Sequence, residues 1–225
     1  MEYIDELFPF NVFDEEMTEY RTLEMSVSDF LAIIKLLNTY KPKTILEIGA
    51  WTGSCTCLFG LYAKKNGAKV YSIDNFNGSP GSVQHAYSKQ ARKQFLNNLK
   101  MFGVERQVKF LEGSSDSFAS MDKEFDMVFI DADHRYSQFK KDMDNYFPKV
   151  KEGGIISGHD YNSVDYDERY IEEDFVNGVH HGVTKCLSEY NNLRLFVEDD
   201  PNKEGGKRLT SSIWYVEKEL APALV

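Results

Sequence analysis

Cysteine is scarce in this chain, with three residues among 225, Cys55, Cys57 and Cys186. So sparse and odd a set argues against a disulfide framework and is typical of a reducing compartment, so we expect a cytoplasmic protein. Cys55 and Cys57 could be interpreted as a metal-binding pair, but two steps along a helix turn the chain by about 200°, which would point the thiols apart. We therefore expect buried free thiols.

Long apolar runs and an excess of basic residues are also missing. No window approaches the ~20 apolar residues of a membrane span, and the N-terminus lacks the basic start and apolar stretch of a secretory signal. Acidic residues number 36 against 26 basic ones, a formal charge of -10, which would repel nucleic acids and anionic lipid surfaces. We therefore expect a small-molecule substrate, with no nucleic-acid partner and no membrane partner.

The composition suits one folded domain, residues 1–225. Hydrophobic residues make up 42% of the chain and aromatics 14%, enough to offset the chain entropy lost on folding. Residues 26–217 form the predicted core. Residues 1–25 carry several Phe side chains among acidic ones and could be either a lid or a homo-oligomer contact.

Short β-rich runs alternate with helical patterns, as the βαβ units of a parallel sheet require. Ser26 can cap a helix over residues 26–39, with Asp29 in its first turn. Further helical patterns lie near 53–65, 89–102, 136–147 and 179–190. Seven strands are predicted at 44–48, 69–73, 108–112, 127–131, 154–157, 193–198 and 211–217. Because only a short polar loop separates the last two strands, the final strand should run antiparallel to its neighbour.

A glycine turn follows the first predicted strand, in Thr44-Ile-Leu-Glu-Ile-Gly-Ala-Trp-Thr-Gly-Ser. Such a turn brings backbone N–H groups and a helix N-terminus against a ligand, although a plain structural turn is an equally good interpretation. The spacing of Gly49 and Gly53, with Trp51 where a pyrophosphate needs bare backbone, disfavours NAD and FAD. The next strand ends at Asp74, whose carboxylate could accept both hydroxyls of a ribose. Small polar residues from Gly113 onward follow the third strand and could either contact an adenine or cap a helix.

The segment Leu46-Glu-Ile-Gly-Ala-Trp-Thr-Gly resembles motif I of class I S-adenosylmethionine-dependent methyltransferases, especially the catechol O-methyltransferase-like and macrocin O-methyltransferase-like groups. The resemblance covers residues 26–217 and implies a doubly wound, Rossmann-like α/β sheet of seven strands, mostly parallel with an antiparallel last strand and helices on both faces. It also implies S-adenosylmethionine as cofactor. The implied cofactor contacts are Glu47, Gly49, Ala50, Trp51, Gly53, Ser54, Asp74, Asn75, Gly113, Ser114, Ser115 and Asp131, with Asp116 beside them. Cys55 stands where catechol-type relatives carry a serine, and Ser54 could substitute for it.

Polar side chains follow two further strands. Asp131 ends the strand in Phe125-Asp-Met-Val-Phe-Ile-Asp-Ala-Asp-His-Arg-Tyr, with Asp133 and His134 beyond it, and Gly153-Gly-Ile-Ile-Ser-Gly-His-Asp-Tyr places His159 and Asp160 after the next. Because carboxyl ends of neighbouring parallel strands meet at one edge, these groups should converge.

Methyl transfer from a sulfonium needs an aligned nucleophile whose proton is removed or whose oxygen is polarised. His134 fits the base, and Asp131 and Asp160 fit a Mg²⁺ site. A solvated His and a helix-capping Asp are the alternative interpretations. The two segments also resemble paired signatures of the macrocin O-methyltransferase-like group, which implies catalytic His134 and Asp131 and metal ligands Asp131, Asp160 and a neighbour, either His159 or Tyr161, where many relatives have an acid or amide.

We therefore predict an O-methyltransferase for a small molecule; a sugar or glycosylated acceptor is implied by the resemblance alone. N-methylation of a small molecule and an inactive S-adenosylmethionine-binding protein stay open. A nucleic-acid methyltransferase conflicts with the acidic charge, and a nicotinamide dehydrogenase with Trp51 and the terminal hairpin. Two long loops cover residues 75–88 and 160–178, and within them residues 76–87 and 161–175 could form substrate walls or be solvated. His85, His180 and His181 are assigned to the surface or to these loops.

Overall fold

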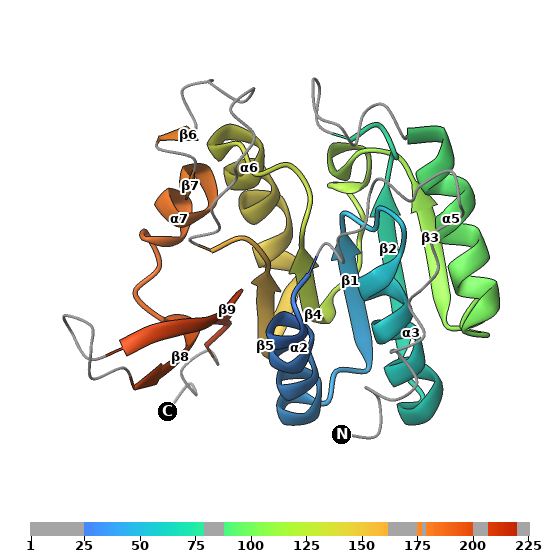
Figure 1. Ribbon diagram of the computed structural model, residues 1–225, viewed down its shortest axis with the longest axis horizontal. Coiled ribbons are helices and arrows are strands. Elements are labelled where there is room, and N and C mark those ends of the chain that lie inside the picture. The colour runs from blue at the N-terminus through green and yellow to red at the C-terminus, as the bar shows by residue number, and fades with distance from the viewer. Residues whose placement is uncertain (1–24, 79–87, 162–174, 177–178, 200–206, 220–225) are drawn as a thin grey trace.

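A computed structural model describes residues 25–78, 88–161, 175–176, 179–199 and 207–219 (Figure 1). Its main element is a seven-stranded sheet of order β3-β2-β1-β4-β5-β9-β8. The strands are β1 Thr44–Ile48, β2 Lys69–Asp74, β3 Val108–Glu112, β4 Phe125–Ile130, β5 Val150–Gly158, β8 Leu193–Asp199 and β9 Lys207–Glu217. Strands β1 to β5 pair in parallel, whereas β9 is antiparallel to both β5 and β8. The predicted mostly parallel, doubly wound sheet with an antiparallel last strand is confirmed.

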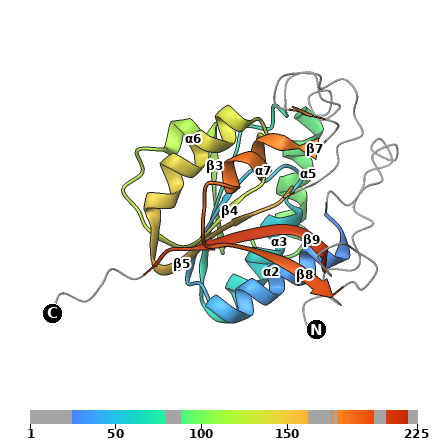
Figure 2. The same ribbon diagram turned by 90° about the vertical axis from the view of Figure 1, so that its left-hand side faces the viewer.

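Helices cover both faces of the sheet (Figure 2). Helices α2, α3 and α5 pack on one face, and α6 and α7 on the other. Their bounds are α2 Val27–Tyr40, α3 Ser54–Asn66, α5 Ser88–Met101, α6 Tyr136–Tyr146 and α7 His181–Leu187, with short 3-10 helices η2 Ser115–Phe118 and η3 Phe147–Lys149. None of the helices in the described ranges is long and apolar enough to cross a membrane.

Strand β1 shows why the sheet lies at the centre. Ile45 faces the helices α2 and α3, whereas Leu46 and Ile48 face α6 and α7, and all three are buried. Full burial of such a side chain stabilises the fold by about 1.5–3 kcal/mol relative to exposure. A polar residue in the middle of this strand, Glu47, is therefore unusual, and it is also fully buried.

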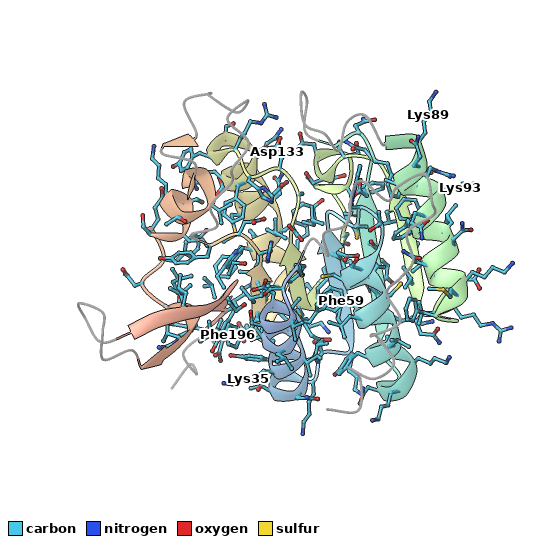
Figure 3. All side chains as sticks on the ribbon, in the orientation of Figure 1. Lys35, Phe59, Lys89, Lys93, Asp133 and Phe196 are labelled. Carbon is cyan, nitrogen blue, oxygen red and sulfur yellow. The ribbon has the colours of Figure 1, made fainter. Side chains whose placement is uncertain are left out.

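Helix α2 begins as the sequence predicts. Ser26 caps it through a reciprocal pair of hydrogen bonds with Asp29, a capping box. The helix packs against β9, and Lys35 lies over the ring of Phe196 on β8 at 5.7 Å (Figure 3). Helix α2 is thereby tied to the two antiparallel strands that close the sheet.

Some predicted bounds were wrong. Strand β5 begins at Val150, not 154, and Gly154 is required there because a Cβ would lie 2.6 Å from the carbonyl oxygen of Asp126. The helix predicted over 179–190 is shorter, since a two-stranded pair, β6 Phe175–Val176 and β7 Val179–His180, precedes α7. All three cysteines are buried and none of them forms a disulfide, as expected. Apart from Met25, the predicted lid or interface over residues 1–25 lies outside the described residues.

Candidate active site

The predicted site residues lie at one edge of the sheet, where β1 to β5 end (top of Figure 1). Three of the four non-glycine residues with positive φ in the described ranges are there, namely Trp51 (45°), Phe76 (55°) and Asp160 (65°). Such backbone costs energy and persists where the surroundings enforce it, often at functional sites. The edge also includes the point between β1 and β4 where strand order reverses, which is where open α/β sheets bind ligands.

The glycine turn after β1 fits closely against β4. Gly49 has a φ of 92°, and a Cβ on it would lie 1.8 Å from the carbonyl oxygen of Asp131. Gly53 has a φ of 90° and precedes α3 without a side-chain cap, so the first N–H groups of the helix face the turn. The turn therefore joins the predicted cofactor residues to Asp131, the first residue after β4.

Asp74 organises this turn. Its Oδ2 accepts hydrogen bonds from the backbone N–H groups of Ala50 and Trp51, both at 2.7 Å, and its Oδ1 accepts one from Phe76 at 2.6 Å. Burial raises the pKa of Asp74, although the backbone donors oppose this shift. The predicted ribose contact would have to share a carboxylate that already holds the turn. Neighbouring Asn75 is exposed and accepts a hydrogen bond from its own loop.

Glu47 lies behind the turn. Its Oε2 accepts hydrogen bonds from Thr56 on α3 at 2.5 Å and from Ser72 on β2 at 2.6 Å. Burial raises its pKa to about 8, so the carboxyl is neutral at pH 7. Its Oε1, like the buried Nε1 of Trp51, has no hydrogen-bond partner among the described residues. The structure thus encloses the Glu47 side chain between β1, β2 and α3 instead of presenting it at the sheet edge.

The segment after β3 is held by α6. Gly113 has a φ of 156°. The hydroxyl groups of Ser114 and Ser117 share a hydrogen bond of 2.9 Å. The backbone carbonyl of Ser115 accepts a hydrogen bond from the Tyr146 hydroxyl on α6. Asp116 forms an ion pair with Lys141. Ser114 precedes η2 but makes no side-chain cap hydrogen bond. The predicted adenine region is therefore a short, fixed turn at the same edge.

Two carboxylates and two imidazoles meet where β4 and β5 end. His134 Nε2 lies 2.8 Å from Asp160 Oδ2 and 3.6 Å from Asp131 Oδ1. His159 Nδ1 lies 3.1 Å and 3.9 Å from the same two oxygens. Ligand atoms of Asp131, His134 and Asp160 all lie within 4.8 Å of one another, as at a metal site. The structure therefore brings all four predicted residues together, and we call them the Asp/His cluster.

Opposite charges stabilise the cluster. Burial lowers the pKa of His134, but the charge of Asp160 and the hydrogen bonds that the imidazole donates to both carboxylates outweigh it and raise that pKa to about 10. The same balance raises the pKa of His159, while the two imidazoles depress the pKa of Asp160 despite its burial. With no cation present, His134 holds a proton at neutral pH and could not act as a base. A cation that neutralised the carboxylates would remove this obstacle.

Asp29 is the residue that sequence reasoning missed. It is buried, and its Oδ2 lies 3.4 Å from His159 Nε2, while its Oδ1 accepts hydrogen bonds from the Ser211 hydroxyl and the Ser212 amide. The sequence shows Asp29 only as part of a capping box. Its contact with His159 joins residues 130 positions apart, which no local pattern reveals.

Other predicted neighbours of the cluster point elsewhere. Asp133 pairs with the guanidinium of Arg135 (Figure 3). Gly182 on α7 packs so tightly on the loop that a Cβ would lie 2.4 Å from the carbonyl oxygen of His134. Phe76 is buried against Phe95 and Phe110 instead of lining a wall. Most of the two predicted substrate walls, His85 and the side chains of His180 and His181 lie outside the described residues.

Comparisons with known proteins agree with this geometry. A family model described as a methyltransferase domain matches residues 46–161, slightly more than half of the chain. No curated protein sequence is significantly similar to the chain. The family match begins within β1 and ends just beyond Asp160, so it includes both the glycine turn and the Asp/His cluster.

Solved structures share the fold at low identity. A Klebsiella pneumoniae protein proposed to be an O-methyltransferase has a TM-score of 0.59 and 17% identity, with 97% of this chain and 96% of that chain covered. A Staphylococcus aureus protein proposed to be a caffeoyl-CoA O-methyltransferase has a TM-score of 0.58, 21% identity and coverage of 96% and 98%. The O-methyltransferase TomG from Streptomyces achromogenes has a TM-score of 0.58, 14% identity and 96% coverage of both chains. The chain belongs to the methyltransferase domain family and is a class I S-adenosylmethionine-dependent methyltransferase.

Proposed function

We propose that this methyltransferase transfers its methyl group to a hydroxyl oxygen of a small molecule at the Asp/His cluster. The observation that carries the proposal is the convergence of Asp131, His134, His159 and Asp160 beside the glycine turn. A hydroxyl is a poor nucleophile until its proton is removed or its oxygen is polarised, whereas the methyl donor is already activated. A group of carboxylates and imidazoles suits that requirement.

The cofactor fits the same edge. S-adenosylmethionine supplies a sulfonium-bound methyl group, which leaves with its C–S bond broken as the acceptor oxygen forms a C–O bond. The turn from Gly49 to Gly53 and the first N–H groups of α3 suit its polar amino-acid portion. The buried, unpartnered Nε1 of Trp51 offers a further donor at this turn. Ribose contact by Asp74 and adenine contact by residues 113–115 complete the proposal.

Within the cluster, His134 is proposed to take the proton of the acceptor hydroxyl. Its side chain is 26% exposed, against 10% for His159, so His134 is the more exposed of the two imidazoles. Asp131 and Asp160 would hold a divalent cation such as Mg²⁺, which lowers the pKa of a bound hydroxyl. The cation would also neutralise the two carboxylates that otherwise keep His134 protonated. The base role and the metal site therefore depend on each other.

The acceptor class has indirect support. The similar solved structures include O-methyltransferases, one of them involved in tomaymycin synthesis, and the charge of -10 disfavours nucleic acids and anionic membranes. A sugar or glycosylated acceptor rests on the macrocin O-methyltransferase-like signatures alone. N-methylation of a small molecule is the alternative, and an inactive S-adenosylmethionine-binding protein is another. A homo-oligomer stays a prediction.

The test is methyl transfer from radiolabelled S-adenosylmethionine to a panel of hydroxylated and amine-bearing small molecules. Calorimetric titration with S-adenosylmethionine and S-adenosylhomocysteine runs alongside. We expect a hydroxyl acceptor, and a loss of transfer in Asp160→Asn with cofactor affinity kept. Asp144→Asn, which alters an exposed ion pair on α6, is the matched control. Turnover of amines alone would replace the O-methylation proposal, and binding without turnover on any acceptor would favour the inactive protein.

A further inference from the structure

The Asp/His cluster has the spacing of a coordination shell. Ligand atoms about 2.1 Å from a four-coordinate ion lie about 3.4 Å apart, and neighbouring ligands of a six-coordinate ion about 3.0 Å apart. The four imidazole-to-carboxylate separations run from 2.8 to 3.9 Å, which brackets both values. Both imidazoles approach the same two oxygens, Asp131 Oδ1 and Asp160 Oδ2. One cation at this point would therefore have a nitrogen ligand as well as oxygen ligands.

The ligand types bear on which cation binds. Mg²⁺ prefers oxygen ligands and keeps several waters. Imidazole nitrogen suits Fe²⁺, Ni²⁺, Cu²⁺ and Zn²⁺, and affinity at a mixed nitrogen and oxygen site rises in the order Mn²⁺, Fe²⁺, Co²⁺, Ni²⁺, Cu²⁺ before it falls at Zn²⁺. Residue 159 contributes an imidazole directly beside Asp160, so the cluster is not an all-oxygen site.

The two imidazoles differ in what holds their rings. The far nitrogen of His159, Nε2, faces the carboxylate of Asp29 at 3.4 Å, and the near nitrogen, Nδ1, faces Asp160. Asp29 is itself fixed by Ser26 at the start of α2 and by Ser211 on β9. A carboxylate on the far nitrogen is the usual support of a metal-binding histidine, because it sets the ring orientation and the tautomer. His159 is also the more buried of the two imidazoles.

We propose that Asp131, Asp160 and Nδ1 of His159 bind a divalent transition metal in preference to Mg²⁺, and that Asp29 is the positioning residue that presents His159 to it. His134 stays outside this ligand set and remains available to the acceptor. The inference deepens the proposed function, since the ion would serve that reaction, but it concerns metal binding and is measured without turnover.

The first experiment titrates chelator-stripped protein with Mg²⁺, Mn²⁺, Co²⁺ and Zn²⁺ by calorimetry. We expect Mn²⁺ to bind tighter than Mg²⁺, and Co²⁺ to bind more than about tenfold tighter than Mg²⁺. Protein-bound Mn²⁺ should show the ¹⁴N coupling of an imidazole ligand in pulsed electron paramagnetic resonance. That signal should disappear in His159→Gln and persist in His134→Gln. His159→Glu replaces the nitrogen ligand by an oxygen ligand and should narrow the difference in affinity between Mg²⁺ and Mn²⁺.

The second experiment isolates Asp29. Asp29→Asn should weaken Mn²⁺ binding by about 10–100-fold, the usual effect of removing the partner of a metal-binding histidine. Because Asp29 also ties α2 to β9, Tyr40→Phe is the matched control. It removes another hydrogen bond between the same helix and the same strand, from the Tyr40 hydroxyl to Glu217, and leaves the contacts of Asp29 in place. Tyr40→Phe should lower thermal stability, with Mn²⁺ affinity within about twofold of the parent protein.

Several results would overturn the inference. These are Mg²⁺ affinity equal to that of Mn²⁺, ¹⁴N coupling that survives in His159→Gln, equal losses of metal affinity in Asp29→Asn and Tyr40→Phe, and no metal binding by protein that still binds S-adenosylmethionine. Transfer to a hydroxyl acceptor by a protein that binds Mg²⁺ as tightly as Mn²⁺ would leave the proposed function standing while this inference fails. Metal binding as described, with no hydroxyl acceptor turned over, would leave this inference standing while the proposed function fails.

Discussion

Replacing Glu47 by Gln tests the fully buried carboxyl behind the glycine turn. Burial raises the pKa of Glu47 from 4.5 to about 8, so between these values the folded chain binds a proton that the unfolded chain has released. The contribution of this carboxyl to the free energy of unfolding is fully present below pH 4.5 and is lost as pH rises through 8. Each pKa unit corresponds to about 1.4 kcal/mol, so up to about 4–5 kcal/mol is lost across the window.

The Gln side chain of Glu47→Gln cannot ionise, so the stability of this variant should lack this dependence on pH. Near pH 5 the variant should be less stable by about 1 kcal/mol, because an amide at the position of Oε1 finds no acceptor there. Near pH 8.5 it should be more stable than the parent protein. Urea unfolding followed by circular dichroism at pH 5, 6.5, 8 and 9 measures both curves.

The matched control is Glu112→Gln, an exposed residue at the end of β3. The difference in the free energy of unfolding between this variant and the parent protein should stay nearly constant over this pH range. The Arg92 hydrogen bond lowers the pKa of Glu112, so Glu112 is ionised in both the folded and the unfolded chain. Parallel curves for Glu47→Gln and the parent protein would refute the reasoning and show that Glu47 is ionised in the folded state.

Three more substitutions test the edge of the sheet. Gly49→Ala should destabilise the fold by more than about 3 kcal/mol in thermal melts, because the new Cβ would lie 1.8 Å from the carbonyl oxygen of Asp131; a normal melt would show that the turn can open. Asp74→Asn should weaken S-adenosylmethionine binding by about tenfold or more in calorimetry, because an amide nitrogen cannot accept the two N–H groups of the turn; unchanged affinity would contradict this role. Trp214→Phe removes the donor to the His159 carbonyl, 2.9 Å away, and should lower the transfer rate with cofactor affinity kept; equal changes in both would indicate general destabilisation.

The sequence was sufficient for the sheet because its strands alternate regularly with helices. The predicted starts of β1, β2 and β3 are those observed, and Ser26 caps α2. Parallel strands must also end at one edge, so the meeting of Asp131 with Asp160 followed from topology. Residue types and strand order together were enough to predict the Asp/His cluster.

Contacts that depend on depth and on distant packing could not be predicted in this way. Asp29 reads as an ordinary capping residue, and only the packing of α2 on β9 brings it to His159. Glu47 and Asp74 have the residue types of ligand contacts, but Glu47 accepts a hydrogen bond from α3 and Asp74 accepts hydrogen bonds from the glycine turn. The side chain's bonding partners, and not its type, determine these roles.

The position of β9 between β5 and β8 affects how the molecule can be assembled during synthesis. Chains emerge from the ribosome N-terminus first, at about 5–20 residues per second. Strands β1, β2 and β3 and their glycine turn lie within residues 44–112 and could pair early. The groups that fix Asp29 and the His159 carbonyl come from β9, at Ser211 and Trp214, and emerge about a hundred residues later. A nascent chain would thus form the glycine turn well before the Asp/His cluster. A chain stopped before residue 207 would lack the β9 residues that hold Asp29 and the His159 carbonyl.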